Sequence, residues 1–130
     1  MAIWQVDFEF DLNADTPLSE VEEYWVRIFG EPIEVVPGFF MYGPEVGSRV
    51  DLCPPKEGEV GFAELIARVD CRERESMQFC EELVRFAAAF GLTYRLLSDE
   101  KTDPLPLDAK VILRLAVKIF KSRLDQIPGL

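Results

Sequence analysis

The strongest constraint on the fold is a strict alternation of apolar and polar side chains close to the N-terminus. The alternating positions are Trp4, Val6, Phe8, Phe10 and Leu12 on one side and Gln5, Asp7, Glu9 and Asp11 on the other. Because successive side chains of a β-strand point to opposite faces, this pattern predicts a strand over residues 3–12 with one face on a hydrophobic core. The three carboxylates should then point away from that core.

Two later segments have the period of an amphipathic helix. The first follows Thr16 and Pro17, which suit a helix start, and ends at Gly30 and Pro32. The second spans residues 72–90 and ends at Gly91. Their apolar stripes are Leu18, Val21, Trp25, Ile28 and Phe29 in the first helix, and Met77, Cys80, Leu83, Val84, Ala87 and Phe90 in the second.

The segment between these helices predicts a meander of three strands. They are residues 33–42, broken or bulged at Pro37–Gly38, then residues 48–53 and 60–71. The joints are rich in Pro and Gly, as turns require. A short strand is expected at residues 92–97.

Residues 108–124 fit either a strand or a helix. We favour a helix, because Asp108 stands at its start and basic residues gather toward its end, as the helix dipole prefers. This helix, about residues 107–124, is expected to cover the second face of the sheet or to form a dimer contact.

The predicted order of elements is β-α-β-β-β-α-β-α in a single α+β domain of residues 1–130. Over residues 3–97 it resembles the ferredoxin-like, split βαβ architecture, with an antiparallel sheet and two inner helices on one face. The extra elements are one strand and the C-terminal helix.

Residues 39–42, Phe-Phe-Met-Tyr, are apolar at every position. In a strand, Phe39 and Met41 would point one way and Phe40 and Tyr42 the other. We expect one pair in the core below the two inner helices and Phe40 and Tyr42 on the opposite face. The second face would then need a cover, supplied by the last helix, a second copy of the chain or another protein.

The charge of the chain disfavours two classes of partner. The formal net charge is −10, which repels nucleic-acid phosphates and anionic lipid. Residues 107–130 nevertheless carry a net +3, so the rest of the chain carries −13.

No apolar run approaches the roughly 20 residues that span a bilayer, so we expect a cytosolic protein. Cys53, Cys71 and Cys80 have no metal-ligand or redox spacing, and we expect them to be structural thiols.

The residue types limit the available chemistry. The chain contains no histidine, which removes the commonest general base and the usual activation of a serine or cysteine nucleophile. It also lacks the glycine-rich nucleotide loops and the EF-hand loop. We therefore assign no catalytic residue, no metal ligand and no cofactor.

The leading hypothesis is a non-catalytic binding module that contacts another protein of basic character, for example an immunity or inhibitor protein. Homodimerisation is an alternative use of the same surface. An acidic rim beside an apolar centre suits such a partner. The candidate contact residues are Asp7, Glu9, Asp11, Phe40, Tyr42, Phe62 and Ile66.

Two alternative functions remain open. A regulatory domain could bind a small molecule in a pocket lined by Trp4, Trp25, Tyr42 and Tyr94. An enzyme could use Asp7, Glu9 and Asp11, spaced about 6.5–7 Å apart along the strand, with or without magnesium.

Overall fold

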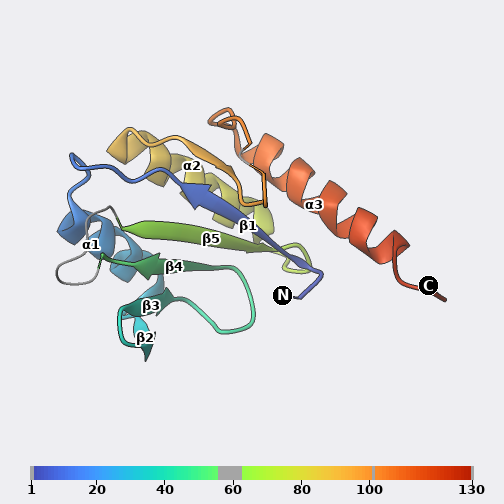
Figure 1. The fold of residues 1–130 in the computed structure, drawn as a ribbon, viewed down its shortest axis with the longest axis horizontal. Helices are drawn as coiled ribbons and strands as arrows, with labels where there is room; N and C mark the ends of the chain where they lie inside the picture. Colours follow the sequence, from blue (N-terminus) through green and yellow to red (C-terminus); the bar gives the residue numbers. More distant parts are fainter. Residues whose placement is uncertain (1, 56–62, 101, 130) are drawn as a thin grey trace.

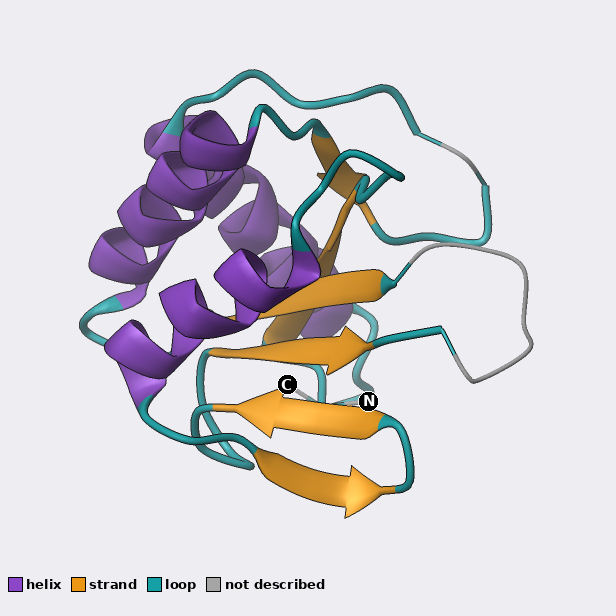
Figure 2. Cartoon of the chain, turned by 90° about the vertical axis from the view of Figure 1, so that its left-hand side faces the viewer, coloured by secondary structure: helices purple, strands orange, loops and turns teal. Residues whose placement is uncertain are grey.

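The structure is a computed structural model that describes residues 2–55, 63–100 and 102–129. Within these residues a six-stranded antiparallel sheet has the order β2-β3-β4-β5-β1-β6, and the helices gather on one side of it (Figures 1 and 2). The elements are β1 (Gln5–Phe10), α1 (Leu18–Phe29), β2 (Ile33–Val36), β3 (Phe39–Tyr42), β4 (Arg49–Cys53), β5 (Glu64–Asp70), α2 (Ser76–Phe90), β6 (Tyr94–Leu96) and α3 (Ala109–Asp125). The prediction of an α+β fold is confirmed.

The ferredoxin-like topology is not confirmed, because the strand order differs. The predicted strand 33–42 is two strands, β2 and β3, which pair in a hairpin. Gly38 has a φ of 83°, and Pro37 before it has a fixed φ, which together suit the tight turn between the two strands. The pairing register also shifts between Glu34 and Val36, as at a β-bulge. The meander is therefore β2-β3-β4-β5, and the chain crosses from β1 through α1 to the far edge of the sheet.

The C-terminal segment is a helix, as predicted, over Ala109–Asp125. The side chain of Asp108 accepts a hydrogen bond from the backbone N–H of Lys110 at 2.9 Å, which satisfies one of the free donors at the helix start. The apolar pattern of this segment also suits a strand. The helix forms instead, because Asp108 caps its start and Ile112 and Ala116 on one helical face pack into the core.

The core lies between one face of the sheet and the three helices. Phe8 and Phe10 of β1 are almost fully buried, and the ring of Phe10 lies 5.4 Å from the ring of Phe86 in α2. Trp25 of α1 packs on Phe86 at 4.9 Å between ring centroids. These aromatic contacts fix both inner helices on the face that the alternation of β1 predicts as buried.

α3 lies on the same side of the sheet as α1 and α2. Its fully buried residues, Ile112 and Ala116, belong to the same core as Phe8, and it packs against α2 and β1 (Figure 1). Arg123 near its end donates hydrogen bonds to the carbonyls of Ile3 and Gln5, at 3.1 and 2.7 Å. The expected cover of the second sheet face by this helix is therefore not what the structure shows.

Candidate functional site

Phe40 and Tyr42 lie on the core face of the sheet, so their predicted placement on the opposite face is wrong. Phe40 pairs with Leu52 and Tyr42 with Val50, and both partners are fully buried core residues. Tyr42 itself is only 2% exposed. The sequence could not distinguish the two pairs, because Phe39 and Met41 are as apolar as Phe40 and Tyr42.

The second face of the sheet carries the other half of each strand. The register places Ile33, Met41, Asp51, Ile66 and Glu9 in one row across five strands. Within the described residues no helix lies on this face (Figure 2). Of the predicted contact residues, Asp7, Glu9 and Ile66 therefore share a face, whereas Phe62 lies outside the residues that the structure describes.

Asp7 is part of a buried charged cluster and is not a free acidic rim residue. Its carboxylate lies 3.1 Å from Nε of Arg68 on β5, and on the next strand, β4, the carboxylate of Asp51 lies 3.2 Å from Nε of Arg49. Asp7 and Asp51 are each only 4% exposed. Burial raises the pKa of both carboxyls by more than the nearby guanidinium groups lower it. Arg68 donates a hydrogen bond to Asp7 and Arg49 one to Asp51, but Arg49 Nε and one carboxylate oxygen of Asp51 have no hydrogen-bond partner among the described residues. The two arginines nevertheless balance the charge of the two carboxylates, which leaves little net acidic character for a partner.

Asp11 is held at the β6 side of the sheet. Its carboxylate accepts hydrogen bonds from Arg95 and from the hydroxyl of Thr93, both at 2.7 Å. With Glu9 and the loop after β6 it lines a small polar cavity of about 380 Å³. The structure thus separates the predicted residues into a buried ion-pair cluster, a polar cavity and the core, and the predicted acidic and aromatic surface is not assembled.

The edge strand β2 is the most exposed apolar element. Ile33, Val35 and Val36 are 60%, 53% and 57% exposed. β2 is the last strand in the sheet order, so its outer backbone groups pair with no strand of the described residues. The sequence contains a signal for this edge position. Pro32 and Pro37 stand directly before and after Ile-Glu-Val-Val, and proline favours the edge of a sheet because it cannot donate a backbone hydrogen bond.

The β6 edge of the same sheet is covered. The segment after β6 returns along it, where Leu105 N–H donates to the carbonyl of Tyr94 at 2.8 Å and the Thr102 hydroxyl donates to the carbonyl of Leu96 at 3.1 Å. The Tyr94 hydroxyl also donates to the carbonyl of Pro106. This loop therefore supplies hydrogen-bond donors to outward carbonyl groups of β6, whereas the outward backbone groups of β2 at the other edge have no strand partner among the described residues.

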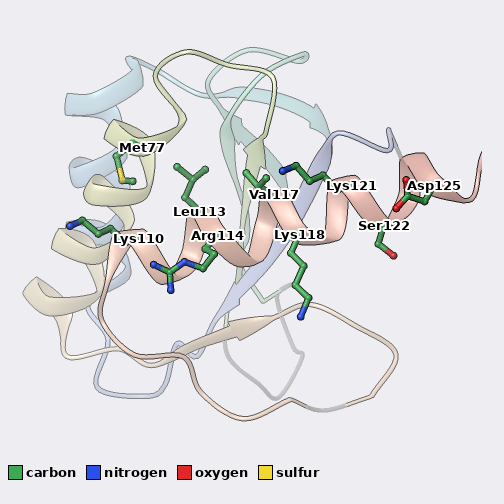
Figure 3. Close-up of a pocket in the computed structure, with 9 residues that line it drawn as sticks. All are labelled: Met77, Lys110, Leu113, Arg114, Val117, Lys118, Lys121, Ser122 and Asp125. Atoms are coloured by element: carbon green, nitrogen blue, oxygen red, sulfur yellow. The ribbon is translucent and has the colours of Figure 1, made fainter. Parts of the chain in front are cut away.

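A groove of about 790 Å³ runs between the start of α2 and the outer face of α3 (Figure 3). Leu113 and Val117 point from α3 to the side on which Met77 of α2 lies, and basic side chains flank them. The basic residues are Lys110, Arg114, Lys118 and Lys121. The structure thus places a positive groove on a chain whose remainder is strongly acidic.

A second groove, of about 550 Å³, has the opposite charge. It lies between the end of α1 and the first half of α2, with Phe29 and Phe79 among its apolar lining. Its acidic residues are Glu73, Glu75, Glu81 and Glu82. Arg85 pairs with Glu81 and Glu82, and Glu73 accepts a hydrogen bond from the Ser48 backbone. Much of this negative charge is therefore already engaged.

Neither a metal site nor a reactive thiol is found among the described residues. They contain no group of three or more Cys, Asp and Glu side chains that could hold a metal ion. The thiols are all free, and burial raises the pKa of Cys80 to about 12 and that of Cys71 to about 11, so neither forms a thiolate at neutral pH. No helix in the described part of the chain is long and apolar enough to cross a bilayer.

Comparison with known proteins gives no further guidance. No family model matches the chain, and neither the curated proteins nor the solved structures contain a match. The function is therefore argued from the surfaces described above.

Proposed function

We propose that the protein is a binding module that contacts another protein by adding an extended segment of that partner to the outer edge of β2. The observation that supports this proposal is the exposure of three large apolar side chains in a four-residue edge strand. Soluble proteins usually shorten, charge or cover such an edge, because it is a template for pairing with another chain. An uncovered apolar edge therefore indicates an interface.

The added strand would gain both backbone and side-chain contacts. Its backbone would satisfy the outward N–H and C=O groups of β2, which is the source of affinity in strand addition. Ile33 shares the second sheet face with its pairing partner Met41, which is only 6% exposed. An apolar side chain of the partner could pack beside Ile33 and Val36, which lie on the same face because their pairing partners Met41 and Phe39 are two residues apart in β3.

The charges around β2 indicate the character of the partner. Glu34 lies within the strand, and Glu31 precedes it by two residues. Since side chains alternate, a partner segment that places apolar residues beside Ile33 and Val36 would place its other residues on the side of Glu34. Lysine or arginine at those positions would pair with glutamate, which fits a basic partner of the kind that an immunity or inhibitor protein binds.

The test uses a peptide of alternating valine and lysine, eight residues long, as the extended probe. We expect it to slow hydrogen exchange of the β2 amides, since added backbone hydrogen bonds protect them. The variant Val35→Lys should abolish this protection, because it places like charge against the probe. Val46→Lys is the matched control, since Val46 is 67% exposed but lies outside the strands.

Three results would contradict the proposal. Protection of amides elsewhere but not in β2 would place the binding at another surface. Equal loss of protection in Val35→Lys and Val46→Lys would show a general charge effect. Protection by a peptide of residues 31–38 of this chain, with none by the valine–lysine probe, would indicate a homodimer instead of a foreign partner.

A further inference from the structure

The groove between α2 and α3 is a second surface, distinct from the β2 edge. We infer that it binds an acidic amphipathic helix of a partner protein, whose apolar side chains would pack on Leu113, Val117 and Met77 and whose carboxylates would meet the basic residues of α3. This inference goes beyond the proposed strand addition and does not depend on it.

The basic residues are arranged for such a ligand. Lys110, Arg114 and Lys118 follow one another at intervals of four residues, which puts them on one face of a helix. Lys121 lies three residues further on, beside Val117, whereas Arg114 and Lys118 project along the other flank (Figure 3). The groove therefore has cations on both flanks of an apolar floor.

These cations are available to a ligand. All four side chains are exposed, and none of them forms a salt bridge within the described residues. Among the described residues, Asp125 is the only acidic one that lines the groove. The local charge is thus uncompensated, even though the whole chain carries −10.

The shape favours a helix over a compact ligand. α3 has 17 residues, which corresponds to a length of about 25 Å. The residues that line the groove extend over most of this length, from Lys110 to Asp125. An elongated groove with apolar residues at positions four apart is the surface onto which an amphipathic helix packs its own apolar stripe.

A second copy of the chain does not fit this groove. A symmetric contact of α3 with α3 would set the four cations of one copy against those of the other. The acidic helix of the chain, α1, has its apolar residues Val21 and Trp25 fully buried in its own core. It could therefore offer charge but no apolar stripe.

Anionic lipid and nucleic acid fit less well than an acidic helix. A helix that lies on a membrane exposes its widest apolar face, whereas Ile112 and Ala116 of α3 are completely buried. A nucleic acid would use the cations but not the apolar floor, and the −13 of the remaining chain would oppose its approach.

The experiment measures binding of a fluorescent 18-residue peptide with leucine at every third or fourth position and glutamate on both flanks. A scrambled peptide of the same composition, a 20-nucleotide single-stranded DNA and phosphatidylserine vesicles are the comparison probes. We expect saturable binding of the helical peptide that weakens as salt is raised and is much tighter than binding of the three comparison probes.

Variants identify the surface. Arg114→Glu combined with Lys118→Glu should weaken peptide binding about tenfold or more, since two attractive contacts become repulsive. Val117→Ser should weaken it about threefold, through the lost apolar contact. Arg27→Glu is the control for charge alone, because Arg27 is exposed and does not line this groove. Thermal unfolding confirms that each variant is folded.

The inference is overturned if the wild-type protein does not bind the helical peptide or binds the scrambled peptide equally well. It is also overturned if Arg27→Glu weakens binding as much as the double variant, or if DNA or vesicles bind more tightly than the peptide. Val35→Lys should leave peptide binding unchanged, so failure of the strand-addition proposal would be seen separately.

Discussion

The two edge strands of the sheet, β6 and β2, differ in how their outward backbone groups are hydrogen-bonded. At β6 the following loop supplies backbone and side-chain hydrogen bonds, including those from Leu105 to Tyr94 and from Thr102 to Leu96. At β2 the outer edge pairs with nothing in the described residues, and the apolar side chains of the strand are more than half exposed. At β6 the covering loop therefore shields the sheet edge, whereas at β2 the outer backbone groups have no strand partner among the described residues, which is the condition that the proposed strand addition requires.

The largest expected difference between the edges is in stability. Tyr94 is fully buried, and its ring stacks on Phe10 at 5.3 Å between centroids. Tyr94→Ala should therefore lower the free energy of unfolding by about 3–5 kcal/mol, the usual cost of emptying an aromatic site. Chemical denaturation measures this value, and a loss below about 1 kcal/mol would show that the β6 edge is not part of the core.

A smaller effect is expected from the side chain that ties β6 to its loop. Arg95 donates to the carbonyl of Thr102 at 2.9 Å and to Asp11 at 2.7 Å, with its side chain 15% exposed. Arg95→Met keeps most of the aliphatic stem and should cost roughly 2 kcal/mol. Hydrogen exchange at the Leu105 amide should accelerate with it, and unchanged exchange there would separate the loop from this contact.

The pH dependence of Tyr94 gives a third comparison. Burial raises the pKa of Tyr94 above 10.0, so its contribution to stability is present below pH 10 and is lost as the pH rises through the folded-state pKa. Tyr94→Phe removes the hydrogen bond to Pro106 and should cost about 1 kcal/mol at pH 7. The stability gap between wild type and this variant should narrow above pH 10.

Tyr42, next to the open edge, is the matched tyrosine. Burial, together with the charges of Glu22 and Glu31, raises its pKa to about 12. Ultraviolet titration of Tyr94→Phe should therefore still show a tyrosine that ionises near pH 12, and Tyr42→Phe should remove it. If Tyr42 ionises near pH 10, its placement in the core is wrong.

The smallest expected effect on stability is at the open edge. Ile33 is 60% exposed, so Ile33→Ala should change the free energy of unfolding by less than about 0.5 kcal/mol. The same variant should weaken protection of the β2 amides by the valine–lysine peptide. A loss of stability comparable to that of Tyr94→Ala would show that β2 is part of the folding unit and would erase the contrast between the edges.

Much of the fold could be predicted from local patterns. The alternation around Phe8 and the stripes that contain Trp25 and Leu83 predicted β1, α1 and α2 and the face on which they pack. The hairpin at Pro37–Gly38 could not be separated from a bulge, because the same two residues suit both. A bulge would leave one strand where the hairpin makes two. The six-strand order, and with it the departure from the ferredoxin-like arrangement, therefore could not be predicted either.

The candidate site was far less predictable. Asp7 stands at a polar position of a strand, and nothing local indicates that Arg68, 61 residues later, pairs with it. The basic residues of α3 were visible in the sequence, but their groove with Met77 depends on the packing of α3 on α2. Sequence periodicity reports which side of an element is apolar and carries no information on its neighbour.

Local sequence patterns are sufficient to assign the element types, since the period of apolar residues is a property of each segment and does not depend on its neighbours. Long-range contacts select which face of β3 is buried, which side of the sheet α3 occupies and which sheet edge is left without a strand partner among the described residues. Each of these choices lies between local alternatives of nearly equal hydrophobicity, such as Phe39 with Met41 and Phe40 with Tyr42. Strand register and helix packing, which join residues distant in the chain, select between them.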